Sequence, residues 1–159
     1  MHLMKALGVI AVLGSNACQE VSWGPGTSQQ EKDEFVAARS SWQAAGIDSY
    51  DFIYTGGCGE CDVSMFPARI NVRGGMIAGA ISLASGEALE VDRTDLELET
   101  VSELFDRIAL TIRENDLKVE ADYDANLGYP VRYEMSCRDR NIMDCFYTFQ
   151  VSEFLAVDP

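Results

Sequence analysis

Apolar residues recur with two different periods along this chain, and the order of these periods restricts the fold that it can adopt. Helical spacing appears first after Ser28 and Glu31, which form a capping-box pattern, and it stops at Gly46. The apolar residues of this run are Phe35, Ala38, Trp42 and Ala45. A second capping-box pattern at Thr100 and Glu103 precedes a longer stripe, made of Val101, Leu104, Phe105, Ile108, Ala109 and Ile112. Two helices are therefore predicted.

Elsewhere apolar and polar residues alternate, as they do in strands with one buried face. Before the second helix, strands are predicted at 50–54, 68–72, 76–83 and 88–91, and Gly74 with Gly75 provides a tight hairpin turn. After that helix, strands are predicted at 119–123, 131–135 and 146–151, the last ending near Phe154. The order helix, strands, helix, strands predicts a single α+β domain, an antiparallel sheet with two main helices packed on one face.

The N-terminal segment 1–17 has the pattern of a bacterial signal peptide. Lys5 precedes an apolar run, and small residues, among them Ser15 and Ala17, stand before the expected cleavage point. The run is too short to span a bilayer. We therefore expect the mature chain to be exported to the bacterial cell envelope.

Cys18 follows the cleavage point directly, at the place where bacterial lipoproteins carry their lipid. The position three residues before it holds Ser15, whereas lipoprotein signals usually have a leucine-like residue there. Ordinary cleavage after Ala17 is therefore an alternative, and one acyl chain alone would bind a membrane weakly. Gln19 favours sorting to the outer membrane, facing the periplasm. Residues 18–30 are rich in Gly, Pro, Ser and Gln, which indicates a flexible tether before the domain at 31–159.

Charge and composition exclude several classes of function. Cleavage would remove Lys5, one of 12 basic side chains, and none of the 26 acidic ones, so the formal charge would move from −14 to −15. Such a surface repels phosphate backbones, so no nucleic-acid partner is expected, and membrane attachment has to come from the lipid anchor. His2 is the only histidine. The mature chain would therefore lack histidine catalysis and histidine metal ligands.

Four further cysteines lie in the domain: Cys58, Cys61, Cys137 and Cys145. In an oxidising envelope the simplest interpretation is two disulfides, and sequence proximity favours Cys58 with Cys61 and Cys137 with Cys145. A bridge between adjacent strands remains an alternative. The Cys-x-x-Cys spacing of the first pair is also that of thiol-disulfide redox proteins, although neighbouring Glu60 raises thiol pKa values. A four-cysteine zinc site fits the spacing of the second pair poorly.

Two groups of acidic residues are candidate sites. Asp122, Asp124 and Asn126 alternate as in a calcium loop, but Gly128 and Glu134 come one place late, and a β-hairpin turn is the plainer interpretation. The second group could supply paired carboxylates for acid–base catalysis, although a solvated edge is the commoner use of such a run. It comprises Glu87, Glu90, Asp92, Asp95, Glu97 and Glu99.

The aromatic residues could line a ligand groove, but core packing is their more usual role. They are Trp42, Tyr50, Phe52, Tyr54, Phe105 and Tyr129.

Several of these features together resemble an uncharacterised bacterial envelope family, often of lipoproteins, that is known only as a domain of unknown function. The carrying residues are Trp42, the alternation at 50–54, the pair Cys58 and Cys61, the hairpin at Gly74 and Gly75, the helix start 100–105, and the motif Tyr123-Asp-Ala-Asn-Leu-Gly-Tyr-Pro130. They cover roughly residues 35–155, and the pair Cys137 and Cys145 departs from the family pattern. The resemblance implies an exported α+β domain and supplies no activity.

The function that these features favour is that of a lipoprotein of the cell envelope: a non-catalytic module that binds an envelope protein partner and needs no cofactor. The alternatives are a thiol-disulfide redox protein that uses Cys58 and Cys61, and a calcium-dependent binding module that uses Asp122, Asp124 and Asn126.

Overall fold

Both helices begin at the predicted capping boxes. In the computed structural model, which describes residues 27–58, 66–91, 98–114, 116–138 and 145–157, α1 spans Gln29–Ala45 and α2 spans Val101–Arg113. Ser28 and Thr100 are the N-caps, and each accepts a hydrogen bond from the backbone three residues on. Gly46 ends α1 in the left-handed conformation, as expected of a helix C-cap. Helix α1 thus includes Gln29 and Gln30, the last residues of the segment that the sequence assigns to the tether.

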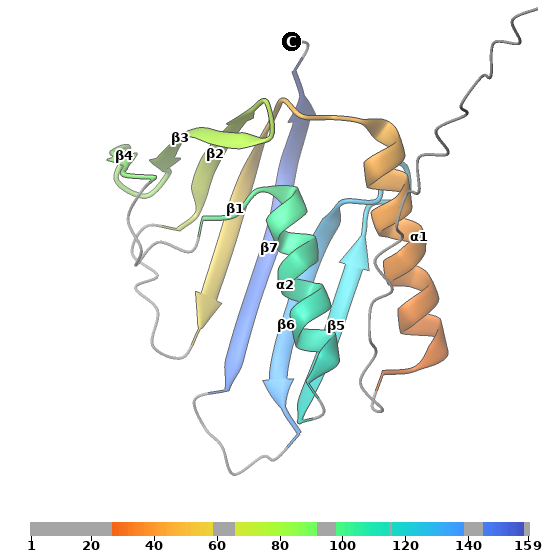
Figure 1. Ribbon diagram of the computed structural model, residues 1–159. Coiled ribbons are helices and arrows are strands. Elements are labelled where there is room, and N and C mark those ends of the chain that lie inside the picture. The colour runs from red at the N-terminus through yellow and green to blue at the C-terminus, as the bar shows by residue number, and fades with distance from the viewer. Residues whose placement is uncertain (1–26, 59–65, 92–97, 115, 139–144, 158–159) are drawn as a thin grey trace, which may run out of the picture.

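The seven strands form one antiparallel sheet, in the order β4-β3-β2-β1-β7-β6-β5 (Figure 1). Their bounds are Tyr50–Cys58 for β1, Ala68–Arg73 for β2, Met76–Ser82 for β3, Ala88–Leu89 for β4, Leu117–Tyr123 for β5, Pro130–Cys137 for β6 and Phe146–Ala156 for β7. The last strand lies between β1 and β6 and so joins the meander β1–β4 to the hairpin β5–β6. The predicted single α+β domain is confirmed.

The strands differ from prediction mainly in length. Strand β1 continues past Tyr54 to Cys58, because its pairing with β7 extends as far as Tyr147. Strand β4 has only two residues, which pair with β3 at the edge of the sheet. The predicted turn at Gly74 and Gly75 is confirmed, with φ values of 57° and 76° that glycine adopts without steric cost.

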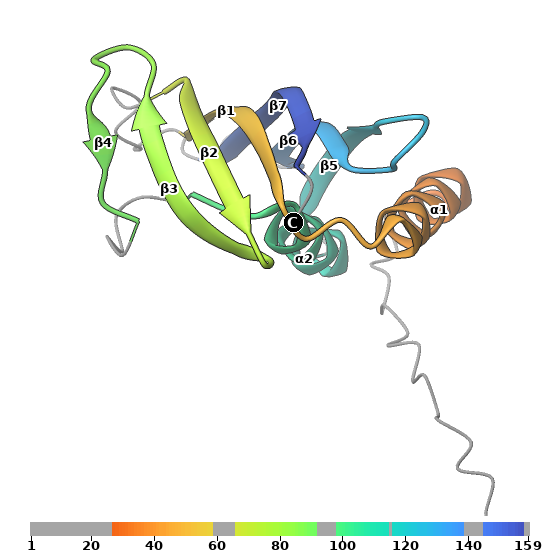
Figure 2. The same cartoon turned by 90° about the horizontal axis from the view of Figure 1, so that it is seen from above.

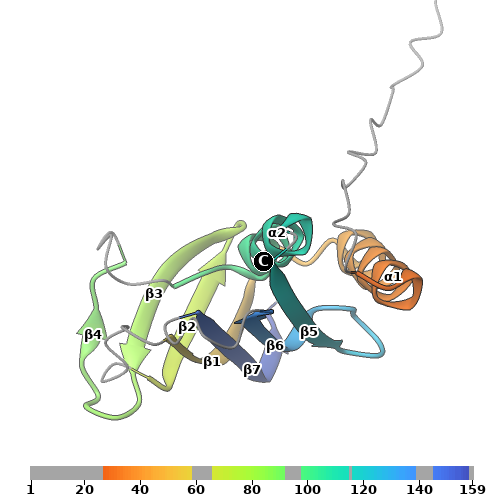
Figure 3. The same cartoon turned by 90° about the horizontal axis from the view of Figure 1, so that it is seen from below.

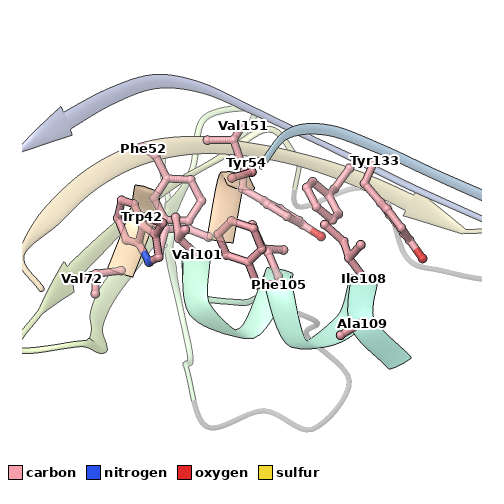
Figure 4. Packing of buried hydrophobic residues seen from close by; sticks show 14 of the residues in the cluster. Trp42, Phe52, Tyr54, Val72, Val101, Phe105, Ile108, Ala109, Tyr133 and Val151 are labelled. Atoms are coloured by element: carbon pink, nitrogen blue, oxygen red, sulfur yellow. The ribbon is translucent and has the colours of Figure 1, made fainter. Parts of the chain in front are cut away.

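Helix α2 packs across one face of the sheet, and α1 lies beside it toward the β5 edge (Figures 2 and 3). The predicted apolar stripe of α2 is buried throughout. It meets the aromatic residues of the central strands, among them Phe52, Tyr54 and Tyr133 (Figure 4). The ring of Phe35 from α1 packs edge-on against Phe105 of α2, with 5.9 Å between ring centroids. Among the described residues, neither helix has the length and apolar character needed to cross a membrane.

A β-bulge in β7 turns one further ring into this core. The register between β1 and β7 shifts between Asp51 and Ile53, and Glu153 has a φ of 48°. The extra residue lets Phe154 stack on Tyr50 and Tyr129, with ring centroids 5.2 and 4.4 Å apart. The bulge therefore fixes the end of β7 against the β5–β6 turn, which contains Tyr129.

Buried tyrosine hydroxyls connect the helix to the sheet. The Tyr50 hydroxyl accepts a hydrogen bond of 2.9 Å from the backbone N–H of Val101 at the start of α2. The Tyr133 hydroxyl donates to Thr111 Oγ1 at 2.7 Å. Burial raises the pKa of both phenols to about 12. These aromatic residues serve the core, which is the structural use that the sequence favours for them.

Candidate binding groove

A groove of about 700 Å³ opens between the N-terminal half of α1, the C-terminal end of α2 and strand β5. Its volume lies within the range of small-molecule and peptide side-chain sites. The floor consists of side chains that β5 presents toward the helices, together with one residue of α2: Leu117, Val119, Ala121, Tyr123 and Ile112. The pattern of β5 explains this floor, because its positions alternate between half-buried and exposed and the half-buried ones line the groove.

The rims of the groove carry charges of opposite sign. Glu31 and Glu34 lie on the α1 side, and Lys118 and Arg138 lie on the sheet side. The two cations have partners, since Lys118 Nζ lies 2.6 Å from Glu120 Oε1 and Arg138 Nε donates to the Leu117 carbonyl oxygen at 3.0 Å. The hydrogen bond and charge of Glu120 raise the pKa of exposed Lys118. Glu31 and Glu34 each accept one local hydrogen bond, from Ser28 N and Gln30 Nε2, and both carboxylates keep further acceptor sites. The acidic α1 side and the apolar floor therefore suit an occupant with an apolar body and a hydrogen-bond donor.

Tyr123 is the polar group on the floor. Its ring lies parallel to that of Phe105, with 6.1 Å between centroids. Within the part of the chain that the structure describes, its hydroxyl makes no hydrogen bond, although the residue is only partly exposed. Burial and the nearby carboxylate of Glu34 raise the pKa of this phenol, so it stays neutral and retains its proton. The groove therefore offers one neutral hydroxyl that can both donate and accept.

The motif from Tyr123 to Pro130 forms the turn between β5 and β6. Asp124 Oδ1 accepts from the backbone N–H groups of Asn126 and Leu127 at 3.0 and 2.7 Å. Gly128 has a φ of 81°, and an added Cβ would overlap the carbonyl oxygen of Ala38 in α1. The turn thus packs closely against α1 at Ala38, and it has the hairpin role that the sequence analysis weighed against calcium binding.

The three predicted calcium ligands do not converge. Asp122 is exposed, and its Oδ2 lies 3.1 Å from Arg132, which also bridges to Glu120 and Glu134. Asp124 uses one carboxylate oxygen within its own turn, and the backbone of Asn126 donates to it. Across the described ranges, no three His, Cys, Asp or Glu side chains are grouped so as to hold a metal. A calcium ion would have to displace these partners, and calcium binding stays a prediction.

Cys137 and Cys145 meet at the end of the sheet where β6 stops and β7 starts. Cys137 and Cys145 form a disulfide with 5.4 Å between their Cα atoms, so this predicted pairing is confirmed. Cys137 also lines the groove. Cys58 ends β1 opposite Tyr147, but its side chain and Cys61 lie outside the described residues. The disulfide and redox predictions for that pair remain untested.

Among the described members of the acidic run 87–99, Glu99 has a defined structural role. Both carboxylate oxygens of Glu99 accept from Arg107 Nε, at 2.8 and 2.7 Å. The Arg107 guanidinium in turn lies over the Tyr147 ring, 4.6 Å from its centroid. Glu87 and Glu90 are exposed, and residues 92–97 lie outside the described part. The signal segment and Cys18 also lie outside it.

Sequence reasoning missed the groove. It assigned Val119, Ala121 and Tyr123 to one face of a strand and Glu31 to a capping box. It gave no role to the other rim residues. What it lacked was the placement of α1 beside β5, which depends on the contact of Gly128 with Ala38, 90 residues apart in the chain. The unusually polar first half of α1, next to an apolar strand face, was the only available signal.

Comparison with known families gives one match. A family described as of unknown function, DUF6174, matches residues 34–156. The matched range includes α2, α1 from Glu34 onward, and the strands β1 to β7. Searches of curated proteins and of solved structures found no match. This family match confirms the expectation that most of the chain belongs to a family known only as a domain of unknown function. Because the match covers well over half of its length, the chain belongs to the DUF6174 family of unknown function.

Proposed function

We propose that this protein is an exported lipoprotein of the bacterial cell envelope that works as a non-catalytic binding module. In this proposal residues 1–17 are removed, Cys18 carries the lipid, and the segment up to Ser28 tethers the domain to the outer membrane, facing the periplasm. The domain then binds an envelope protein partner. The lipid would need a second acyl chain, because a single chain anchors weakly.

The observation that carries the proposal is the disulfide between Cys137 and Cys145. Disulfides persist in oxidising compartments such as the periplasm and are rare in the cytosol. This bond agrees with an N-terminal sequence that has the basic start, apolar run and small residues of an export signal. Two independent parts of the chain therefore support the same compartment.

The binding role rests on the groove. Its apolar floor, its neutral Tyr123 hydroxyl and its charged rims are features of a recognition site. The polar groups of the core, by contrast, are engaged in structure: the Tyr54 and Tyr147 hydroxyls share a hydrogen bond of 2.8 Å, and Tyr50 caps α2. These contacts favour a module that holds a partner at its surface.

The experiment is intact-mass measurement of protein expressed with its own signal in a bacterial host, before and after reduction. We expect a chain that starts at Cys18, carries acyl groups and gains two hydrogen atoms for every disulfide reduced. The matched control is Cys18→Ser, which should lose the acyl mass and leave the membrane fraction.

Two results would contradict the proposal. An uncleaved chain with free thiols would exclude export. A chain cleaved before residue 18 but without acyl groups would show that the protein is secreted in the ordinary way and is not a lipoprotein.

A further inference from the structure

The groove opens where the described chain begins. Thr27, the first described residue, is one of the residues that line it, and α1 starts two residues later at Gln29. The described chain therefore begins at the groove itself. This position makes the segment before Thr27 the nearest candidate occupant.

The sequence of this segment contains one large aromatic residue. Residues 19–26 read Gln-Glu-Val-Ser-Trp-Gly-Pro-Gly, so Trp23 stands alone among small and polar neighbours, with Val21 as the other apolar residue. A tether whose only task is to be flexible gains nothing from an indole, because exposed aromatic surface is costly in water. The Gly-Pro-Gly that follows allows the chain to reverse direction before α1.

Both the length of the segment from Trp23 to Thr27 and the chemistry of the indole fit the groove. Trp23 lies four residues before Thr27, and four extended residues span at most about 13–14 Å. The floor from Leu117 to Ala121 also covers four steps along β5, or about 13 Å. An indole has a flat apolar face for this floor and a single N–H donor, and the carboxylates of Glu31 and Glu34 and the Tyr123 hydroxyl are acceptors at the rim and floor.

We infer that the groove between α1, α2 and β5 is the docking site of the protein's own N-terminal segment, with the Trp23 side chain on the apolar floor formed by Leu117, Val119 and Tyr123. Docking shortens the tether and holds the domain close to residue 18. A partner that binds the groove has to displace Trp23, and its binding lengthens the tether. This inference deepens the proposed function. It rests on that function in one respect only, namely that the processed chain begins at residue 18.

The test uses the chain from residue 18 onward with Cys18→Ser, which keeps it free of lipid. Trp23 and Trp42 are the only tryptophans, so subtracting the emission of a Trp23→Phe variant isolates the signal of Trp23. We expect that signal to be blue-shifted and protected from acrylamide quenching relative to a peptide of residues 18–28. Val119→Asp places a charge on the floor and should abolish both effects.

A matched control places the same charge on another strand, outside the groove. Ile81→Asp changes an exposed apolar position of β3, and it should leave the Trp23 signal protected. Melting curves of both variants, read from the circular dichroism of the helices, confirm that the domain is folded in each case. Emission of Trp23 equal to that of the peptide would overturn the inference.

Two further outcomes would also overturn it. Protection that appears only as the protein concentration rises would make a second copy the occupant. Protection that survives in Val119→Asp would place Trp23 elsewhere on the domain. Neither result depends on where the protein is located in the cell, so failure of this inference is distinguishable from failure of the proposed export and lipidation.

Discussion

At the scale of single residues, Gly128 has two separate reasons to be glycine. Its φ of 81° lies in the left-handed region, and its Cα faces the backbone of α1 so closely that a Cβ would overlap the Ala38 carbonyl oxygen and touch Ser41 Cβ at 3.0 Å. Gly86 separates these effects, because it has a φ of 76° but open space around it. Comparing Gly128 with Gly86 therefore separates the energetic cost of the left-handed backbone from the cost of the contact with α1.

We expect Gly128→Ala to destabilise the protein more than Gly86→Ala. The left-handed conformation costs an alanine about 1–2 kcal/mol, and this cost applies to both variants. The clash with α1 adds about 1–3 kcal/mol at Gly128 alone. Urea unfolding measures both values, and equal losses would mean that α1 shifts away from the turn without cost.

The buried phenols make stability depend on pH in the alkaline range. The pKa of Tyr50 and of Tyr133 rises from the ordinary value of 10.0 to about 12, because burial disfavours the charged form. A pKa raised by folding contributes stability that is complete below pH 10 and is lost as the pH rises from 10 through about 12. Burial raises the pKa of Tyr54 as well.

We expect the free energy of unfolding to be flat near neutral pH and to fall above pH 10, by at most about 1.4 kcal/mol per pH unit for each buried phenol. Tyr133→Phe should reduce this slope while also lowering stability at neutral pH, since it leaves Thr111 without its hydrogen bond. Chemical denaturation at a series of alkaline pH values tests the slope. An unchanged slope in the variant would mean that Tyr133 titrates as an exposed phenol.

At the scale of elements, the two capping boxes have the same sequence pattern but different surroundings. Thr100 is 5% exposed, whereas Ser28 is exposed at the start of α1. Thr100 Oγ1 accepts from Glu103 N and donates to Glu103 Oε2 at 2.8 Å. Replacing a buried cap leaves its partners without water, so the cost depends on burial.

We expect Thr100→Ala to cost about 1–2 kcal/mol of stability and Ser28→Ala about 0.5 kcal/mol. Thermal unfolding followed by circular dichroism compares them. A larger loss from Ser28→Ala would contradict the expectation that the exposed cap of α1 stabilises the protein less than the buried cap of α2.

The Cys137–Cys145 disulfide closes the connection between β6 and β7. For cysteines eight residues apart, the loop-entropy relation gives a stabilisation of about 2–3 kcal/mol. The double variant Cys137→Ser/Cys145→Ser should lose about this amount in urea unfolding and should resemble the reduced protein. A Cys58→Ser/Cys61→Ser variant that lost this stability without reduction, and lost no more on reduction, would instead assign the stabilising bond to the first pair.

Elements whose signals are local in the sequence are predictable here, and elements that depend on distant partners are not. The stripe of α2 and the turn at Gly74 and Gly75 follow from periodicity and glycine chemistry alone, and both are confirmed. The extension of β1 to Cys58 and the bulge at Glu153 depend on β7, which is roughly 100 residues away from β1 in the chain. The groove has the same origin, since it forms only when α1 and β5 meet.

At the scale of the whole molecule, two electrostatic effects oppose each other. Surface ion pairs such as that of Arg39 with Asp106, at 2.7 Å, stabilise the fold modestly and weaken as salt is added. The processed chain, in contrast, would carry a formal charge of −15 over about 140 residues, and the mutual repulsion of its carboxylates also weakens in salt. Exposed pairs contribute about 0–1 kcal/mol each, so the repulsion should dominate.

We therefore expect the melting temperature of the processed chain to rise between about 0.01 M and about 0.15 M NaCl, as the Debye length falls from about 30 to about 8 Å. A fall would mean that the ion pairs outweigh the net charge. Comparing CaCl2 with MgCl2 at equal concentration then isolates specific binding from screening, because both salts screen alike. An added rise in calcium alone, lost in Asp122→Asn, would establish the calcium site. Equal melting curves in the two salts would mean that Asp122 serves as an ion-pair partner of Arg132. The cations would then relieve the repulsion of the acidic surface without binding at a specific site.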